Sequence, residues 1–522
     1  MILESHVEGS WRKGSGEGRP FINPVTGDVL GRIDDTGIDQ QAAVAFARRE
    51  GTPALAALSF AERADLLGNI VNVLVANRDR YFEIARLNSG NTKTDATIDI
   101  DGSIGTLKWA ARLARSLGSA HCLVEAGQDQ LVKEPVFFSR HLWTSRPGVA
   151  VQINAFNFPA WGMWEKVATA IVAGVASIAK PASATAWLPH EMVRDIVAAG
   201  VLPPGALSLV CGSGKQLASY LGPMDSLAFT GSSDTGLMLR DSASKLKAPP
   251  RLNVEADSIN ATVLGPDATS GSAISDLLRR EVGKALSIKA GQLCTNIRRV
   301  FVPEGMLEEL SQSLVEDAAK IVVGDPASED VRMGPLVDPS QRDSALDNIG
   351  RLKQEARVLA GGGVPAEIRG GDAKSGSFVA PTILRCDTPT EAVALHQIEV
   401  FGPCVTLMPY RSLDEACELV ARNGGALALS LFTDDPDVQV KTVAKLGPWH
   451  GRVLIADSTV GKNHTGHSIV MPQCVHGGPG HAGGGEELGG LRGLRLHMQR
   501  SAIQGSPATL EKITEDAAEA AI

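Results

Sequence analysis

Short apolar runs of strand length alternate along the chain with longer segments in which apolar residues recur at helical spacing. This alternation is typical of parallel sheets whose faces are covered by helices. The pattern predicts strands at residues 148–153, 175–179 and 206–210, helices at 164–173 and 184–199, and a turn at 212–214 that opens a further helix. Repeated units of this kind predict a doubly wound α/β domain with binding sites at the carboxyl ends of its strands.

The same pattern predicts a second α/β unit, which begins with the strand that carries Glu255 and includes helices at 275–286 and 306–321. A site between the two units is therefore expected. The predicted boundaries are 1–122 and 146–252 for a dinucleotide-binding domain, 253–465 for the second domain, 123–145 and 480–505 for segments that fit neither, and 506–522 for an acidic tail that should fray.

Composition agrees with a soluble enzyme and excludes several other classes. The chain has 522 residues, 43% of them hydrophobic and 21% charged, enough to bury large cores in two or three domains. The net charge of −9 and the lack of long Lys/Arg clusters argue against a nucleic-acid partner. The most apolar stretch, 167–179, is shorter than the ~20 residues that span a bilayer, so no membrane association is expected.

Targeting and redox signals point to the cytoplasm. The N-terminus lacks a basic segment followed by an apolar run, so no secretion signal is predicted. Seven cysteines at irregular spacing form neither a disulfide framework nor Cys-x-x-Cys metal pairs. They are interpreted as reduced thiols in a reducing compartment.

The segment Lys289-Ala290-Gly291-Gln292-Leu293-Cys294-Thr295-Asn296, with Glu255 upstream, holds the most informative candidate chemistry. A thiol and a carboxylate from separate segments are what oxidation of an aldehyde through a thioester needs, namely a nucleophile and a base for water. Alone, either residue means little, because a single cysteine is more often a small buried hydrophobe.

Several other motifs occur along the chain in a fixed order together with these two residues. Because of this ordered set, the chain resembles the aldehyde dehydrogenase superfamily over about residues 10–505. The motifs that carry the resemblance are Asn23-Pro24-Val25-Thr26-Gly27, Asn154-Ala155-Phe156-Asn157-Phe158-Pro159, Lys180-Pro181-Ala182-Ser183, Phe229-Thr230-Gly231-Ser232, the Glu255 and Cys294 segments, Met333-Gly334-Pro335-Leu336, Pro381-Thr382-Ile383-Leu384 and Glu399-Val400-Phe401-Gly402-Pro403.

The resemblance implies a role for each catalytic candidate. Cys294 attacks the aldehyde, and the Asn157 amide together with the Cys294 backbone N–H holds the oxyanion. Glu255 then activates water, although the Ala256-Asp257-Ser258 that follows it departs from the family's Leu-Gly-Gly. Glu487 either relays protons or only pairs with a cation. The thiol needs help from local dipoles or cations, and Lys289, Arg298 and Arg299 are close in sequence.

The resemblance also implies a nicotinamide cofactor. Lys180 is placed beside the adenosine ribose, where the family carries a glutamate three residues later and this chain has Ser183. Without that carboxylate the 2′-phosphate of NADP is not repelled, so NADP is predicted, with NAD as the alternative. The remaining cofactor-binding candidates are Phe156, Gly231 and Ser232 in the turn before a helix, Glu399 at the nicotinamide ribose, and Phe401, which could equally be core.

Two other signals are rejected. Residues 212–216 resemble a P-loop but have Leu209 in place of the first glycine and Gln216 in place of Ser/Thr. The histidines His464, His467, His476 and His481 match no zinc spacing and are interpreted as turn and pocket residues, so no metal is predicted. The glycine-rich stretch 477–485 is either a linker or, as in the family, a lining of the substrate entrance.

Three motifs resemble one branch of the family, whose members oxidise CoA-linked semialdehydes in aerobic degradation of phenylacetate and benzoate. The three motifs are residues 154–162, Glu255-Ala256-Asp257-Ser258, and His476-Gly477-Gly478-Pro479-Gly480 continued through 484–490. The substrates implied are of the 3,4-dehydroadipyl-CoA semialdehyde or 3-oxo-5,6-dehydrosuberyl-CoA semialdehyde type. A homodimer or homotetramer is also implied, joined by the bridging segments. The alternatives are a general NAD-dependent aldehyde dehydrogenase, an acylating dehydrogenase, and a catalytically silent binding protein of the same fold.

Overall fold

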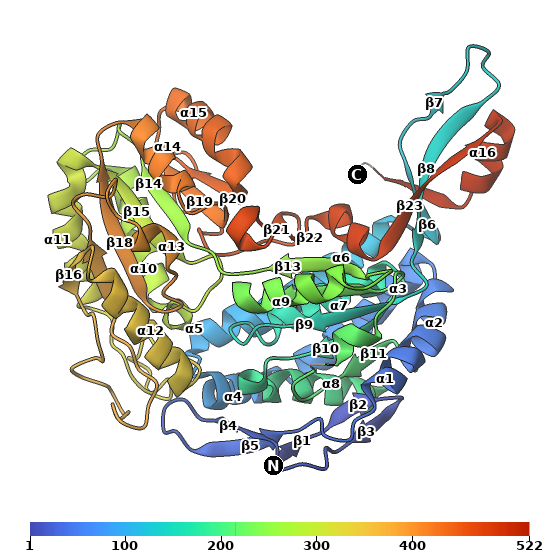
Figure 1. The fold of residues 1–522 in the computed structure, drawn as a ribbon, viewed down its shortest axis with the longest axis horizontal. Coiled ribbons are helices and arrows are strands. Elements are labelled where there is room, and N and C mark those ends of the chain that lie inside the picture. The colour runs from blue at the N-terminus through green and yellow to red at the C-terminus, as the bar shows by residue number, and fades with distance from the viewer. Residues whose placement is uncertain (215, 521–522) are drawn as a thin grey trace.

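The computed structural model describes residues 1–214 and 216–520. It has two α/β units side by side and a third, smaller sheet that extends away from them with the β7–β8 arm (Figure 1). The predicted α/β class is confirmed. Within the described ranges, no helix is both long and apolar enough to cross a membrane.

The first unit is built on a seven-stranded sheet in the order β13-β12-β9-β10-β11-β2-β3. Its strands are β13 (Arg251–Glu255), β12 (Ser226–Thr230), β9 (Val149–Ile153), β10 (Ala176–Lys180), β11 (Leu207–Leu209), β2 (Ser5–Val7) and β3 (Ser10–Arg12). The first five are parallel, and β2 and β3 are antiparallel. A separate three-stranded sheet, β1 (Ile2–Leu3), β5 (Val29–Ile33) and β4 (Arg19–Ile22), lies near the N-terminus.

The pairing register determines how the carboxyl ends of the strands in this sheet are aligned. Ile153 pairs with Lys180 and with Phe229, and Thr230 pairs with Glu255, so the carboxyl ends of β9, β10, β12 and β13 are aligned. Helices that accompany these strands are α7 (Trp161–Val172), α8 (Trp187–Ala199) and α9 (Ser233–Ser244), with α3 (Phe60–Ala76), α4 (Arg78–Ser89) and α6 (Gly102–Ser116) from the N-terminal region. The segments that follow these strands therefore lie together at the carboxyl edge of the sheet.

Two expectations for this unit differ from the structure. The strand that carries Glu255 pairs with β12, so it belongs to the first sheet and the boundary expected after residue 252 lies beyond residue 255. The turn at 212–214 is followed by a short 3-10 helix, Leu217–Tyr220, rather than an α-helix. Lys215, part of the rejected P-loop pattern, lies outside the described residues.

The second unit has a seven-stranded sheet in the order β16-β17-β18-β15-β14-β19-β20. Its strands are β16 (Arg357–Ala360), β17 (Thr382–Arg385), β18 (Cys404–Tyr410), β15 (Ile297–Pro303), β14 (Asn260–Leu264), β19 (Ala426–Phe432) and β20 (His450–Ala456). The central strands are buried along nearly their whole length, as expected for a parallel sheet covered on both faces.

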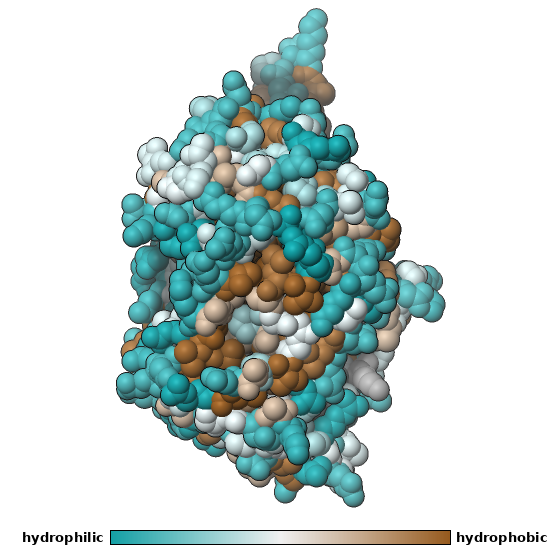
Figure 2. Space-filling view, turned by 90° about the vertical axis from the view of Figure 1, so that its left-hand side faces the viewer, coloured by the Kyte–Doolittle hydropathy of each residue, from teal (hydrophilic) through white to brown (hydrophobic). Residues whose placement is uncertain are grey.

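Most longer helices of the second unit begin at a polar cap. The Ser272 side chain caps α10 (Ala273–Ser287), and α11 (Leu307–Ala318) has Glu308 and Glu309 in its first turn, where carboxylates favour the helix dipole. The other helices are α12 (Pro339–Leu352), α14 (Leu413–Ala421) and α15 (Pro436–Leu446). Figure 2 shows the molecule from the left-hand side of Figure 1, where the second unit lies. The surface is largely hydrophilic on this side, and apolar residues gather toward the middle of the view.

The third sheet joins distant parts of the chain. It comprises β23 (Met498–Gly505), β8 (Phe138–Ser145), β6 (Cys122–Glu125) and β24 (Ala517–Ala520), with β7 (Asp129–Gln130) paired to β8. The tail expected to fray instead forms α16 (Pro507–Thr514) and β24, because Leu510 and Ala520 are buried and β24 pairs with β6. Residues 480–497, expected in this sheet, lie instead in and after the hairpin β21 (Val475–Gly477) and β22 (Glu486–Leu488).

Candidate active site

A cavity of about 1410 Å³ runs between the two α/β units along the aligned strand ends. It is larger than the roughly 300–1,000 Å³ of common small-ligand pockets and so suits a dinucleotide together with a substrate. Every predicted catalytic and cofactor residue except Glu487 lines it: Cys294, Glu255, Asn157, Phe156, Lys180, Ser183, Gly231, Ser232, Glu399 and Phe401.

Strand ends explain how residues far apart in sequence meet there. Asn157 follows β9, Lys180 ends β10, Ser232 follows β12 and Glu255 ends β13. Because these strands are parallel and in register, their following residues project toward the same edge. Cys294 arrives from the second unit, in the loop just before β15.

The loop that carries Cys294 is shaped by a strained turn. Lys289 and Ala290 both have φ of 49°, a left-handed conformation uncommon for residues with side chains, and Gly291 has φ of 72°. A Cβ at Gly291 would clash with the carbonyl oxygen of Gly402. On the other side, the Asn260 side chain donates to the Cys294 carbonyl oxygen at 2.8 Å and so fixes the backbone of the nucleophile.

Cations expected to assist the thiol are engaged elsewhere. Lys289 lies over the Phe158 ring and 3.9 Å from Asp99. Arg298 donates to Glu399 and to backbone carbonyl groups, and Arg299 donates to the carbonyl oxygens of Ile259, Leu419 and Val420. Burial raises the pKa of the Cys294 thiol well above its usual range, and the nearby Glu255 carboxylate raises it further.

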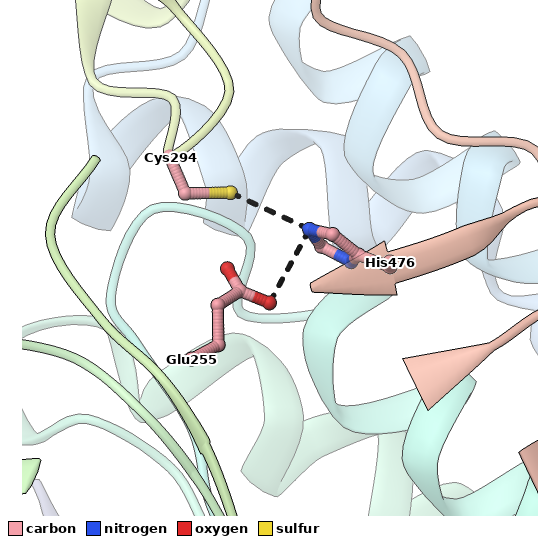
Figure 3. Close-up of side chains that lie close together, drawn as sticks. All are labelled: Glu255, Cys294 and His476. Atoms are coloured by element: carbon pink, nitrogen blue, oxygen red, sulfur yellow. Dashed lines mark hydrogen bonds and ion pairs between the residues drawn. The ribbon is translucent and has the colours of Figure 1, made fainter. Parts of the chain in front are cut away.

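The side chain closest to both Cys294 and Glu255 is one that the sequence did not single out for catalysis. His476, on β21, places Nε2 3.8 Å from the Cys294 sulfur and 3.3 Å from Oε2 of Glu255 (Figure 3). Neither oxygen of the Glu255 carboxylate makes a well-aligned hydrogen bond within the described residues, although the side chain is 1% exposed. A buried carboxylate without such partners is suited to accept a proton.

The sequence places His476 with His464, His467 and His481 among turn and pocket residues, because their spacing matches no zinc pattern. The donor atoms of Glu255, Cys294 and His476 lie within 4.8 Å of one another, a spacing that a metal ion would also tolerate. The residues nevertheless correspond to the expected nucleophile and base, whose chemistry requires no metal.

Glu487 lies behind the cavity in a buried charged group. Its carboxylate is 2.9 Å from Nζ of Lys166 and accepts a hydrogen bond from Asn253 at 2.9 Å. Lys166 is also 3.2 Å from Glu165, whose other neighbour is His476 at 3.9 Å. Burial raises the pKa of Glu165, against the opposing charge of Lys166, whereas the carboxylates around Lys166 outweigh its burial and raise its pKa.

At the other end of the cavity, polar groups line a channel suited to an anionic dinucleotide. Ser232 caps α9, so the N-terminal turn of that helix faces the cavity. Burial lowers the pKa of Lys180, and the Asp35 carboxylate, which accepts a hydrogen bond from the Gly214 N–H at 3.1 Å, opposes that shift.

Glu399 and Phe401, which the sequence predicts at the nicotinamide end, both line the cavity. Glu399 accepts hydrogen bonds from the Ser258 N–H at 3.0 Å and from Arg298, and burial raises its pKa to about 7. The Phe401 ring meets Phe156 edge-on, with ring centroids 5.6 Å apart. Both rings line the cavity, so Phe401 is not simply a core residue.

The glycine-rich stretch lines the site rather than linking domains. A Cβ on Gly483 would clash with the carbonyl oxygen of Val254, and one on Gly485 would come within 2.6 Å of the same atom. Ala256, after the catalytic glutamate, donates to the Ala482 carbonyl oxygen. These glycines let the hairpin pack directly on β13, which places His476 beside Glu255.

Comparison with known proteins agrees with this fold and site. The aldehyde dehydrogenase family profile matches residues 11–500, so the chain belongs to the aldehyde dehydrogenase family. It is an oxidoreductase that acts on aldehydes, in a family that uses NAD or NADP.

Particular relatives make the similarity more specific. The chain is 44% identical to the 3,4-dehydroadipyl-CoA semialdehyde dehydrogenase of Aromatoleum evansii, over 92% of this chain and 93% of that one. Its fold is similar to betaine aldehyde dehydrogenase of Staphylococcus aureus (23% identity, TM-score 0.83, 96% of each chain). It is also similar to PnpE from Pseudomonas sp. WBC-3 (23% identity, TM-score 0.84, 100% of this chain and 99% of that one).

Proposed function

We propose that this protein oxidises a CoA-linked semialdehyde of the 3,4-dehydroadipyl-CoA semialdehyde type to the carboxylic acid, with NADP as hydride acceptor. The observation that carries this proposal is the convergence of Cys294 and Glu255 on one cavity, in a chain 44% identical to a dehydrogenase for that semialdehyde. The corresponding role is one step in aerobic aromatic-acid degradation.

Cys294 and Glu255 divide the chemistry between them. The Cys294 sulfur attacks the aldehyde carbon, and the Asn157 amide, which lines the same cavity, stabilises the resulting oxyanion. When bound, the cofactor accepts the hydride from that carbon. Glu255 then takes a proton from water, which attacks the thioester left on Cys294 and releases the acid. A base in this position favours hydrolysis over transfer of the acyl group to free CoA.

The preference for NADP is supported by charge at the ribose end of the cavity. Lys180 and Ser183 both line it, and a neutral residue at 183 leaves Lys180 able to pair with a 2′-phosphate. Asp35 weakens the preference for NADP, because its carboxylate interacts with the Lys180 charge and so competes with a 2′-phosphate. The proposal therefore assigns NADP as the preferred cofactor and leaves NAD usable.

A direct assay tests both parts of the proposal. We expect reduced-cofactor absorbance to rise fastest with NADP and 3,4-dehydroadipyl-CoA semialdehyde, and the product to be the free acid. Ser183→Glu should reduce kcat/KM for NADP by about tenfold or more, since one unfavourable charge contact costs about 1.4 kcal/mol. Ser183→Ala is the matched control and should keep the preference. Faster turnover of a free aliphatic aldehyde with NAD would contradict the substrate and cofactor assignments together.

A further inference from the structure

We infer that His476 is a catalytic residue that takes the proton from Cys294 and holds its thiolate, with Glu165 as the residue that positions the imidazole. This inference rests on the proposed function only in taking Cys294 as the nucleophile. Its basis is the contact of one imidazole nitrogen with the sulfur and with Glu255 (Figure 3). The other nitrogen faces Glu165 at 3.9 Å.

Distances place the ring between a proton donor and two carboxylates. Nε2 is 3.8 Å from the Cys294 sulfur and 3.3 Å from Glu255, and Nδ1 is 3.9 Å from Glu165. A positive charge on the ring would therefore lie between two acidic side chains and beside the thiolate. Cys294 and His476 are thus within reach of each other as nucleophile and base. Nδ1 makes no hydrogen bond within the described residues, so Glu165 acts on the ring through its charge, at ion-pair distance.

The Cys294 thiol needs a nearby positive charge to ionise, and this need is a second argument for His476. Burial and the Glu255 carboxylate both oppose ionisation of Cys294, and Glu165 and Glu399 add to the negative field. Lys289, Arg298 and Arg299, the cations close in sequence, are engaged with other groups. An imidazolium in contact with the sulfur supplies the missing positive charge.

The surroundings of His476 keep it in place. On the hairpin, His476 and Glu487 are cross-strand partners, so their side chains lie on the same face. Glu487 binds Lys166, and Lys166 in turn binds Glu165. The charged groups around the ring are thus Glu255 from β13, Glu165 and Lys166 from α7, Glu487 from β22, and Cys294; Arg452 on β20 and Glu399 act on the sulfur from farther away.

The proposed steps conserve atoms and charge. The S–H bond of Cys294 breaks and its proton bonds to Nε2 of His476, while the sulfur electron pair forms a C–S bond to the aldehyde carbon and the carbonyl π electrons move to oxygen. A bound nicotinamide cofactor would accept the hydride of that carbon while the oxyanion electrons re-form the carbonyl group, and a thioester would remain on Cys294. Water then adds as Glu255 takes its proton, the C–S bond breaks, and the departing sulfur recovers the proton from His476.

The test is the pH dependence of Cys294 alkylation in the free enzyme, which needs neither substrate nor cofactor. Iodoacetamide modification is followed by mass spectrometry on the peptide that contains Cys294, so that the exposed Cys474 does not interfere. His476→Gln should slow the reaction at pH 7 by about tenfold or more and shift its pH midpoint upward, because the thiol is left with burial and Glu255 alone.

Two further variants sharpen the result. Glu165→Gln should shift the midpoint in the same direction by a smaller amount, as a positioning residue would. His464→Gln, in the loop before β21, is the matched control and should behave as wild type. If His476→Gln does not yield folded protein by thermal melting, the Glu165→Gln midpoint decides, and its coincidence with wild type would overturn the inference.

An unchanged alkylation rate and midpoint in folded His476→Gln would equally refute the role of His476. Failure of the proposed function would be seen separately, as lack of turnover with the CoA-linked semialdehyde in wild-type enzyme whose Cys294 alkylation still depends on His476.

Discussion

At the residue scale, the reactivity of Cys294 is decided by its neighbours rather than by its own segment. Burial and Glu255 raise the pKa of the thiol, so the residue that we propose as base for water also opposes formation of the proposed nucleophile. Formation of the thiolate is hindered by the Glu255 carboxylate, whereas activation of water requires it. His476, in contact with both side chains, is the group that we propose reconciles these two requirements.

This conflict gives a prediction for Glu255→Gln. Loss of the carboxylate removes its repulsion of the thiolate but also the base that activates water. We expect a burst of about one equivalent of reduced cofactor per site, followed by a steady rate lower by about 10²–10⁴-fold, the usual contribution of general base catalysis. Stopped-flow absorbance measures both phases.

Cys294→Ala, as the control, should show no burst but should still bind NADP. A Glu255→Gln enzyme with a steady rate near that of wild type would remove Glu255 from the hydrolytic step.

At the element scale, the left-handed turn at 289–291 aims Cys294 into the cavity. Its shape depends on Gly291, whose φ of 72° and close approach to Gly402 leave no room for a side chain. The glycines at 483 and 485 act in the same way on the other wall, since they let the hairpin contact β13. Close backbone approaches thus set the positions of both Cys294 and His476.

We therefore expect Gly291→Ala to destabilise the protein by about 1–3 kcal/mol and to reduce kcat strongly, because the turn must shift to relieve the clash. Denaturant unfolding and steady-state kinetics measure the two effects.

Gly283→Ala is the matched control, on α10, where an added Cβ meets nothing within 4 Å. It should be neutral or stabilising by up to about 1 kcal/mol. Equal stability of the two variants would show that the turn at 291 is not constrained.

At the scale of the whole molecule, the C-terminal tail completes the third sheet. Leu510 and Ala520 are buried, β24 covers the edge of β6, and Arg140 on β8 donates to Thr514 at 2.8 Å. None of the described tail residues lines the cavity. The tail thus stabilises the part of the molecule expected to join subunits, while the reaction takes place elsewhere.

Leu510→Ala should accordingly lower the free energy of unfolding by about 2–5 kcal/mol, the usual cost of a leucine-sized cavity, with kcat/KM nearly unchanged in the folded enzyme. The exposed Glu511→Ala serves as its control. Thermal melting together with light scattering would show whether assembly changes with stability. A Leu510→Ala protein as stable as wild type would mean that the tail frays, as the sequence alone had suggested.

The positions of many strands and helices were predictable because hydrophobic period is a local property of the chain. The strands at 148–153 and 175–179 and the helix at 275–286 were predicted to within a few residues. The strand with Glu255 was assigned to the wrong unit, since sequence does not state which neighbour a strand pairs with. The tail was misjudged for a related reason: short acidic segments lack a strong pattern, and only pairing with β6 orders β24.

The sequence by itself determined the fold class, the family, and that Cys294, Glu255 and the predicted cofactor residues would line one cavity, because these depend on ordered motifs and on hydrophobic period. Only the tertiary structure decided that Lys289, Arg298 and Arg299 are engaged elsewhere and that His476 contacts Cys294. His476 and Glu165 are distant in sequence from Cys294 and Glu255, and the motif that begins at His476 assigns that residue no role. Their meeting depends on glycines that let a hairpin pack against β13, a long-range steric condition that no local pattern records.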